Sequence, residues 1–160
     1  MVATEREAYD LLTKLDVTYQ TVEHPAITSV IDVPFELPGP QVKNLVLKSK
    51  KGQRIYLVIL PDEKQADLKH LAAILNEKRL SFLSEDSLLQ ALNVPAGTVT
   101  PLALPNDYDK KITVVIDRTI DQNNTVGFHP NVNIKTVIMP FKEFQRVLTH
   151  LDYAPLYINV

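Results

Sequence analysis

The 160-residue chain contains no cysteine, which removes disulfides, thiolate nucleophiles and cysteine-ligated zinc from consideration. Several common catalytic signatures are absent as well: the chain has no GxSxG elbow, phosphate-binding loop, GxGxxG turn or HExxH helix. Its four histidines lack the spacing of metal ligands. If the chain is an enzyme, its site must therefore be built from less familiar parts.

Long apolar runs are also missing, so no segment is expected to span a bilayer and no membrane partner is expected. Residues 1–16 mix charged and apolar side chains and lack the apolar stretch of a signal peptide, which favours the cytoplasm. The net charge of −2 gives no sign of nucleic-acid binding by the chain as a whole. Five basic residues nevertheless fall within positions 43–54. They can grip a phosphate backbone, or they can surround a solvated hairpin turn at Lys50-Lys51-Gly52.

Hydrophobic periodicity and turn signals predict one α/β (α+β) domain over residues 1–160. Strands and helices do not alternate regularly, which favours a mixed, mostly antiparallel sheet flanked by helices over a doubly wound parallel sheet. The proline-rich stretches 29–41 and 93–109 are predicted to be loops, and 55–60 is apolar enough for a strand covered on both faces. Helices are expected at 4–15, 67–75, 84–92 and 141–151, and strands at 19–23, 42–49, 54–60, 80–83, 111–117, 125–129 and 133–139.

Lys43 and Asn44 open the otherwise apolar strand 42–49. Side-chain alternation along a strand puts the two residues on opposite faces. Both would then stand at the mouth of the strand, where a ligand could reach them. The alternative is an ordinary strand end whose polar groups are solvated.

A second candidate is the loop Gly97-Thr98-Val99-Thr100-Pro101. Glycine permits close approach of a ligand, and proline fixes the far end of the loop. Such a loop can offer backbone N–H groups to a developing oxyanion. The alternative is a simple connection after a helix.

The third candidate is Gly127-Phe128-His129-Pro130-Asn131, with Asn133 and Thr136 beyond it. A residue before proline favours an extended backbone, so His129 is expected to end a strand. There it could orient a substrate or shuttle a proton. The alternative is a hydrogen-bonded structural histidine.

Taken together, these segments resemble the YbaK/ProX-type aminoacyl-tRNA editing family, which includes the prolyl-tRNA synthetase-associated domain, and in particular its freestanding alanyl-tRNA(Pro) deacylases. The resemblance runs from about residue 20 to residue 140. One departure is the short, proline-rich segment 33–40, where family members often carry a longer helical insertion that helps to select the amino acid. The carriers are His24-Pro25, Lys43-Asn44-Leu45, Tyr56-Leu57-Val58, Arg79-Leu80-Ser81-Phe82, Gly97-Thr98-Val99-Thr100-Pro101-Leu102, Phe128-His129-Pro130, Asn133 and Thr136.

The resemblance implies hydrolysis of the ester that joins a wrong amino acid to tRNA(Pro), most typically alanine. It assigns catalytic roles to Lys43, Gly97 and His129, and it implies no cofactor and no metal. The implied partners are the acceptor end of mischarged tRNA(Pro) and prolyl-tRNA synthetase. A deacylase for cysteine or serine and a non-catalytic tRNA- or synthetase-binding module on the same fold remain alternatives. The implied substrate-binding residues are Asn44, Thr98, Val99, Thr100, Pro101, Phe128 and Asn131.

Overall fold

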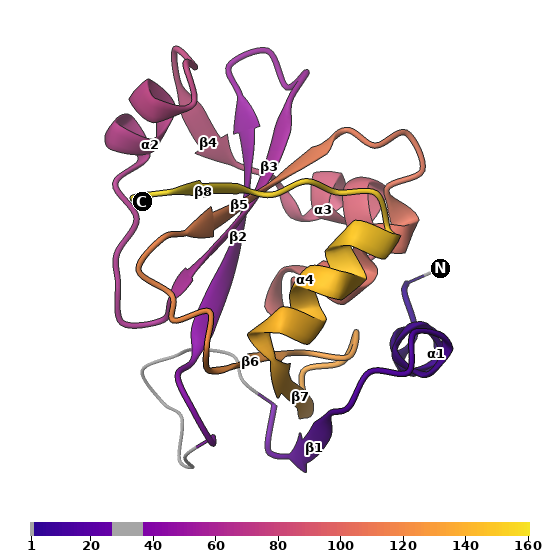
Figure 1. Cartoon of the computed structure of the whole chain (residues 1–160). Helices are drawn as coiled ribbons and strands as arrows, with labels where there is room; N and C mark the ends of the chain where they lie inside the picture. Colours follow the sequence, from indigo (N-terminus) through magenta and orange to yellow (C-terminus); the bar gives the residue numbers. More distant parts are fainter. Residues whose placement is uncertain (1, 27–36) are drawn as a thin grey trace.

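The computed structural model describes residues 2–26 and 37–160, whose strands form two sheets (Figure 1). The three-stranded sheet is antiparallel, with the order β1-β7-β6. The five-stranded sheet has the order β4-β2-β3-β5-β8, in which β5 runs parallel to both β3 and β8. The strands are β1 (Gln20–Glu23), β2 (Val42–Ser49), β3 (Ile55–Pro61), β4 (Leu80–Phe82), β5 (Ile112–Asp117), β6 (Thr125–Phe128), β7 (Lys135–Pro140) and β8 (Leu156–Ile158).

The expected mixed, mostly antiparallel architecture flanked by helices is confirmed, and the division into two sheets is a new finding. Three of the four α-helices in the described chain begin at a capping side chain. Thr4 Oγ1 accepts the Glu7 N–H at 3.2 Å, and Asp67 and Ser84 cap the next two helices in the same way. These three helices are α1 (Glu5–Lys14), α2 (Leu68–Ile74) and α3 (Glu85–Leu92); the fourth, α4 (Phe141–His150), follows Pro140 and has no side-chain cap.

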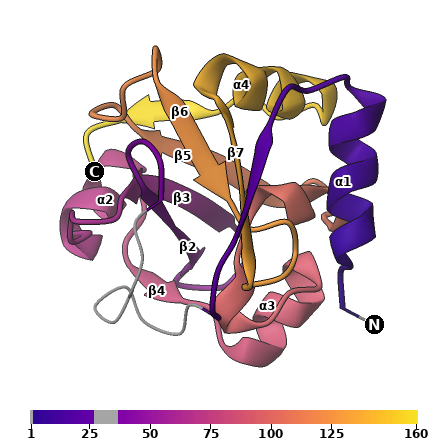
Figure 2. The same cartoon turned by 90° about the horizontal axis from the view of Figure 1, so that it is seen from below.

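Strand β3 is the centre of the molecule because both of its faces are covered, as its apolar sequence predicts. Leu57 and Ile59 face a larger core that α1, α3, α4 and the three-stranded sheet complete. Val58 and Leu60 face a smaller core under α2. Figure 2 shows α2 on the opposite side of the molecule from α1. No helix within 2–26 and 37–160 is long and apolar enough to cross a membrane.

Two regions differ from what the sequence predicts, and a third lies largely outside the described residues. The predicted loop 93–109 contains two 3₁₀ helices, η2 (Ala96–Thr98) and η3 (Pro101–Asn106). The second begins because Pro101 fixes its first φ angle and Thr100 Oγ1 accepts the N–H of Leu102 at 3.2 Å. Strand β8 was not expected. The predicted loop 29–41 lies largely outside the described residues, which resume at residue 37.

Candidate functional site

Strand β2 brings Lys43 and Asn44 to the end of the five-stranded sheet that lies near β6. The Cα of Asn44 pairs with that of Ile59, which faces the larger core, and the Cα of Lys43 pairs with that of Leu60, which faces the smaller core. The two side chains therefore lie on opposite faces of β2, as the alternation predicts.

An acidic neighbour of Lys43 was not anticipated from the sequence. Burial raises the pKa of the Asp62 carboxyl and Glu63 adds to this rise, whereas the positive charge of Lys43 opposes it. The Asp62 N–H donates to Gln41 O at 3.1 Å, which holds the carboxylate at the beginning of β2. Lys43 thus shares its end of the strand with a carboxylate whose charge partly offsets its own.

The loop Gly97-Thr98-Val99-Thr100-Pro101 is largely buried and has one exposed position. Thr98, Thr100 and Pro101 are buried, and Val99 packs against the larger core. Gly97 is exposed, and a methyl group built on it would meet only Asn133 Nδ2, at 3.9 Å. Gly97 therefore has open space above it and lies next to the β6–β7 loop.

The β6–β7 loop carries His129 and Asn131. His129 Nδ1 lies 2.9 Å from the carbonyl oxygen of Lys135, so this nitrogen donates and Nε2 is left as the acceptor of the neutral ring. Burial lowers the pKa of His129; the hydrogen bond to Lys135 O opposes that effect, and the charge of His24 adds to it. His129 is therefore a neutral base at physiological pH.

A second histidine, which directly follows β1, supports this loop. His24 is buried, and its Nε2 lies 2.8 Å from Thr136 Oγ1 on β7. Its Nδ1 lies 2.9 Å from the carbonyl of Pro25. The ring centroids of His24 and His129 are 6.0 Å apart. His24 belonged to the family resemblance but not to the predicted site, and its position beside His129 is the feature that sequence reasoning missed.

Two amide oxygens in the predicted site are buried without a hydrogen-bond partner. In the described chain, Asn44 Oδ1 and Asn131 Oδ1 are the buried side-chain oxygens or nitrogens in this condition. The Nδ2 of Asn131 donates to the carbonyl of Thr4 at 2.8 Å, so this side chain is held in place while its oxygen is unpaired. An unpaired buried acceptor costs about 1–3 kcal/mol, so a donor from water or from a ligand would stabilise either oxygen.

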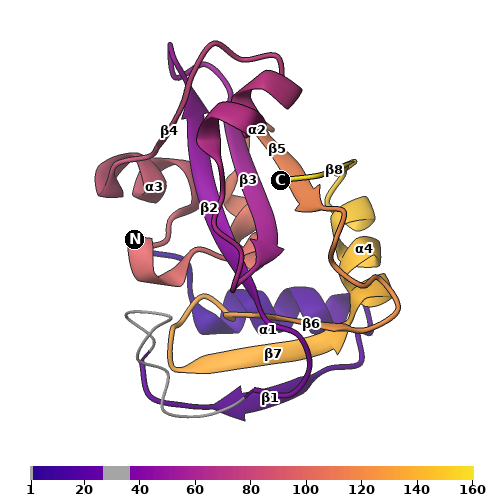
Figure 3. The ribbon, with the colours of Figure 1, turned by 90° about the vertical axis from the view of Figure 1, so that its left-hand side faces the viewer.

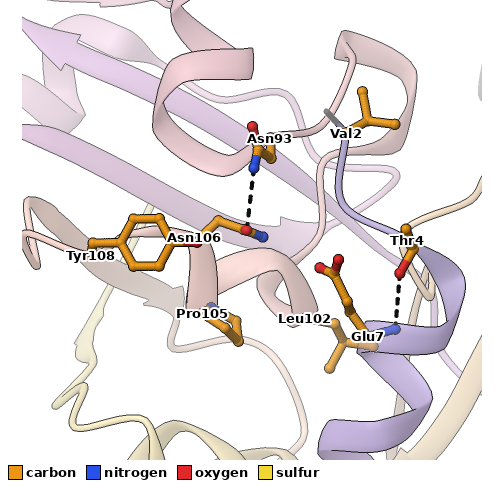
Figure 4. Close-up of a pocket in the computed structure, with 8 residues that line it drawn as sticks. All are labelled: Val2, Thr4, Glu7, Asn93, Leu102, Pro105, Asn106 and Tyr108. Atoms are coloured by element: carbon orange, nitrogen blue, oxygen red, sulfur yellow. Dashed lines mark hydrogen bonds between the residues drawn. The ribbon is translucent and has the colours of Figure 1, made fainter.

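A cavity of about 350 Å³ lies elsewhere, between the beginning of α1, the end of α3 and η3 (Figure 4). Its wall includes Glu7, Asn106 and Tyr108 and none of the predicted site residues. In this wall, Asn93 Nδ2 donates to Asn106 Oδ1 at 3.4 Å. Because Thr4 also lines this cavity and its carbonyl holds Asn131, the cavity lies behind the β6–β7 loop.

The structure brings the exposed Gly97 and the loop carrying His129 and Asn131 together. It also puts the start of β2 beside β6, since Gln41 Oε1 lies 3.7 Å from the methyl position of Gly127. Phe128 is buried, and its ring packs tilted against that of Phe144 with the ring centroids 4.5 Å apart, so it supports the site from within the core. Lys43 stands on the other face of β2 from Asn44. Among the described residues, no group of three or more His, Asp or Glu side chains could hold a metal ion.

Known proteins provide three close comparisons. Residues 24–147 match the family model of the aminoacyl-tRNA editing domain. The prolyl-tRNA editing protein ProX of Acetoanaerobium sticklandii is 31% identical over 140 residues, which cover 86% of this chain and 85% of that protein. Prolyl-tRNA synthetase associated domain-containing protein 1 of Xenopus laevis is 34% identical over 161 residues, which cover 96% of this chain and 95% of that protein.

A solved structure agrees with this architecture. The crystal structure of a candidate trans-editing enzyme for prolyl-tRNA synthetase matches with a TM-score of 0.70 and 16% identity, covering 100% of this chain and 99% of that chain. At this identity the likeness bears on the fold alone. Together with the sequence matches, it confirms the resemblance that the sequence motifs indicated.

Proposed function

Since the chain belongs to the aminoacyl-tRNA editing domain family and is an aminoacyl-tRNA deacylase, we propose that it edits mischarged tRNA(Pro) and that alanyl-tRNA(Pro) is its preferred substrate. We also propose that residues 1–160 act as one editing domain in the cytoplasm. Prolyl-tRNA synthetase, which charges this tRNA, is the proposed protein partner.

The observation that carries the proposal is that two candidate site residues, Asn44 and Asn131, each have a buried amide oxygen without a hydrogen-bond partner, while His129 Nε2 is left as an acceptor. An aminoacyl-adenosine presents donors to such a site: the ribose hydroxyl beside the ester and the ammonium group of the amino acid. A substrate donor would remove the cost of the unpaired acceptors. The site is therefore suited to binding this kind of group.

In the proposed reaction, a water oxygen attacks the ester carbonyl carbon, and the bond between that carbon and the ribose oxygen breaks. The oxyanion that forms is stabilised by backbone N–H groups of the Gly97 loop other than that of Thr98, which donates to Pro95 O at 3.0 Å. The proton of the water passes to the departing ribose oxygen, through His129 Nε2 or through the neighbouring ribose hydroxyl. The aminoacyl ester is an activated ester, so positioning and oxyanion stabilisation suffice without a protein nucleophile.

Lys43 has the role of holding a phosphate or the substrate backbone in this proposal. A lysine carries its charge on a flexible four-carbon stem. The ammonium group of Lys43 can therefore reach a substrate at the end of β2, although Lys43 lies on the face of the strand that is directed to the smaller core. Its neighbour Asp62 limits where the ammonium group settles when no substrate is bound.

Selection of alanine follows from size. A synthetase pocket built for proline cannot strongly reject a smaller side chain, because missing methylenes provide only about 1–3 kcal/mol of discrimination. A second site with a stiff wall excludes proline, since overfilling such a pocket costs about 1–3 kcal/mol. The buried Thr98, Thr100 and Pro101 supply a wall of this kind.

The test is a set of parallel time courses on one tRNA(Pro) carrying alanine, proline, cysteine or serine. We expect fast release of alanine and sparing of proline. Equal hydrolysis of the alanyl and prolyl forms would rule out selection by size. If cysteine or serine were released faster than alanine, the preferred substrate would be the cysteinyl or seryl form. Absence of release from every form would leave only a binding role.

A further inference from the structure

The β2–β3 turn and the start of β4 form one basic surface from two separate parts of the sequence. The Cα of Ser49 pairs with that of Leu80, so Lys78 and Arg79, which precede β4, lie beside the turn. Figure 3 shows this turn at the end of the molecule far from β1, β6 and β7. We call this surface the hairpin patch; its basic residues are Lys48, Lys50, Lys51, Arg54, Lys78 and Arg79.

The charge of the hairpin patch is largely uncompensated. Residues 48–54 and 77–79 carry six basic side chains and one acidic side chain, which leaves eleven basic and eighteen acidic side chains for the rest of the chain. The acidic residue, Glu77, lies 3.6 Å from Arg54 and also accepts the Tyr56 hydroxyl at 2.9 Å. In the described chain, the other five basic residues have no ion-pair partner within 4.0 Å. An otherwise acidic molecule thus concentrates positive charge at one end.

An aromatic side chain accompanies these charges. Phe82 on the edge strand β4 is 57% exposed, although it is a large apolar group. Exposed aromatic rings beside lysine and arginine are typical of surfaces that bind nucleic acids, because the cations contact phosphates and the ring can stack on a base. An exposed aromatic ring does not increase solubility, so solubility alone does not explain this combination of residues.

The distance to the editing site determines which part of a tRNA would reach the patch. Asn44 and Ser49 lie on the same strand, five residues or about 17 Å apart. This separation is longer than one nucleotide. A tRNA whose terminal aminoacyl-adenosine is at Asn44 would therefore bring backbone phosphates upstream of its 3′ end to the hairpin patch.

We infer that the hairpin patch binds the phosphate backbone of the tRNA acceptor arm and so holds the substrate while its 3′ end occupies the editing site. This inference rests on the proposed function. If the inference holds, the hairpin patch contributes to the binding of a full-length tRNA but not to the hydrolysis of the ester. The two effects can be separated by using a long and a short substrate.

The experiment compares the double variant Lys50→Glu/Lys51→Glu with a control that changes the net charge equally. Both lysines are exposed at the turn, so their replacement leaves the cores intact. The control is Lys14→Glu/Lys142→Glu, whose lysines are exposed on α1 and α4. Deacylation is measured on full-length alanyl-tRNA(Pro) and on an alanylated CCA trinucleotide.

We expect the patch variant to lose at least about tenfold in kcat/KM on the full-length tRNA, through KM, and to keep its activity on the trinucleotide. The control should retain activity on both substrates. Equal losses on both substrates would overturn the inference, because the patch would then act at the ester. Full activity of the patch variant on tRNA, or an equal loss in the control, would also overturn it.

Binding of uncharged tRNA over a range of salt concentrations provides a readout that does not depend on deacylation. Loss of two phosphate contacts should reduce the slope of log K against log salt by about 1.5. If the wild-type protein binds tRNA in this way but hydrolyses no charged form, the proposed function fails and the patch inference stands. Unchanged tRNA binding together with lost binding to anionic lipid vesicles would assign the patch to a membrane and overturn it.

Discussion

At the scale of single residues, the two glycines Gly97 and Gly127 are expected to have different roles, the first in function and the second in packing. A methyl group at Gly97 finds open space, whereas at Gly127 it would lie 2.9 Å from Thr136 Cγ2. We expect Gly97→Ala to keep or slightly raise the free energy of unfolding, by up to about 1 kcal/mol, and to reduce deacylation by about tenfold or more because the methyl group occupies the space of the ester.

The matched control is Gly127→Ala, which should lower stability because Thr136 has to move. Thermal unfolding and deacylation rates measured side by side separate the two cases. A Gly97→Ala variant with full deacylase activity would show that the substrate does not approach this loop closely.

Residue patterns indicated the candidate site residues but not the residues that support them. Lys43, Asn44, Gly97 and His129 stand out because polar or flexible residues interrupt apolar strands or tight loops. The contact between His24 and Thr136 cannot be predicted in this way, because it joins residues 112 positions apart through the pairing of β1 with β7. The proximity of Asp62 to Lys43 likewise depends on the register of β2 and β3.

At the scale of elements, the start of η3 connects stability with substrate selection. Thr100 is fully buried, and its hydroxyl accepts the N–H of Leu102. We expect Thr100→Val to lower the free energy of unfolding by about 1–2 kcal/mol, since a buried N–H loses its partner. The less rigid wall should also narrow the ratio of alanyl- to prolyl-tRNA(Pro) hydrolysis.

The conservative variant Thr100→Ser retains the hydroxyl and should stay close to wild type in selectivity. Urea unfolding and the two rate constants for each variant provide the measurements. If Thr100→Val loses stability but keeps full selectivity, the loop holds the fold without forming the selecting wall.

Elements with local signals were predicted well, and elements that depend on distant partners were not. Helices α1, α2 and α3 depend on local signals, since Thr4, Asp67 and Ser84 cap them within a few residues. Strand β8 was missed because Leu156–Ile158 is three residues long and is stabilised by parallel pairing with the distant strand β5. The division of the strands into two sheets could not be predicted from the sequence either, since strand order depends on non-local contacts.

At the scale of the whole molecule, two groups with lowered pKa values, His129 and Asp117, make the fold less stable on acidification. The pKa of His129 is lowered by burial, so acidification below about 6.5 protonates the unfolded chain first and destabilises the fold. Burial alone would raise the pKa of Asp117, but hydrogen bonds from Lys64 Nζ at 2.7 Å and from Thr119 outweigh it and lower the pKa. Its contribution is present above about pH 4 and is lost as the pH falls through the lowered pKa.

We therefore expect the free energy of unfolding to fall in two steps on acidification, the first below about pH 6.5 and the second below about pH 4. Urea titrations at a series of pH values measure both. His129→Asn keeps a donor near Lys135 O and should remove the first step only, whereas Asp117→Asn should remove the second. A His129→Asn variant with an unchanged first step would assign that step to another group.

The β2–β3 hairpin limits how the chain can change its length in evolution or by design. Insertion of one residue between Asn44 and Ser49 would exchange the faces of every side chain on one side of the insertion and expose part of a core. Insertion of two residues in β2 and two in β3 keeps the faces and moves the turn outward by about 7 Å. Length variation in this hairpin should therefore occur in matched pairs, and each pair would suit a substrate whose charged arm begins farther from its reactive end.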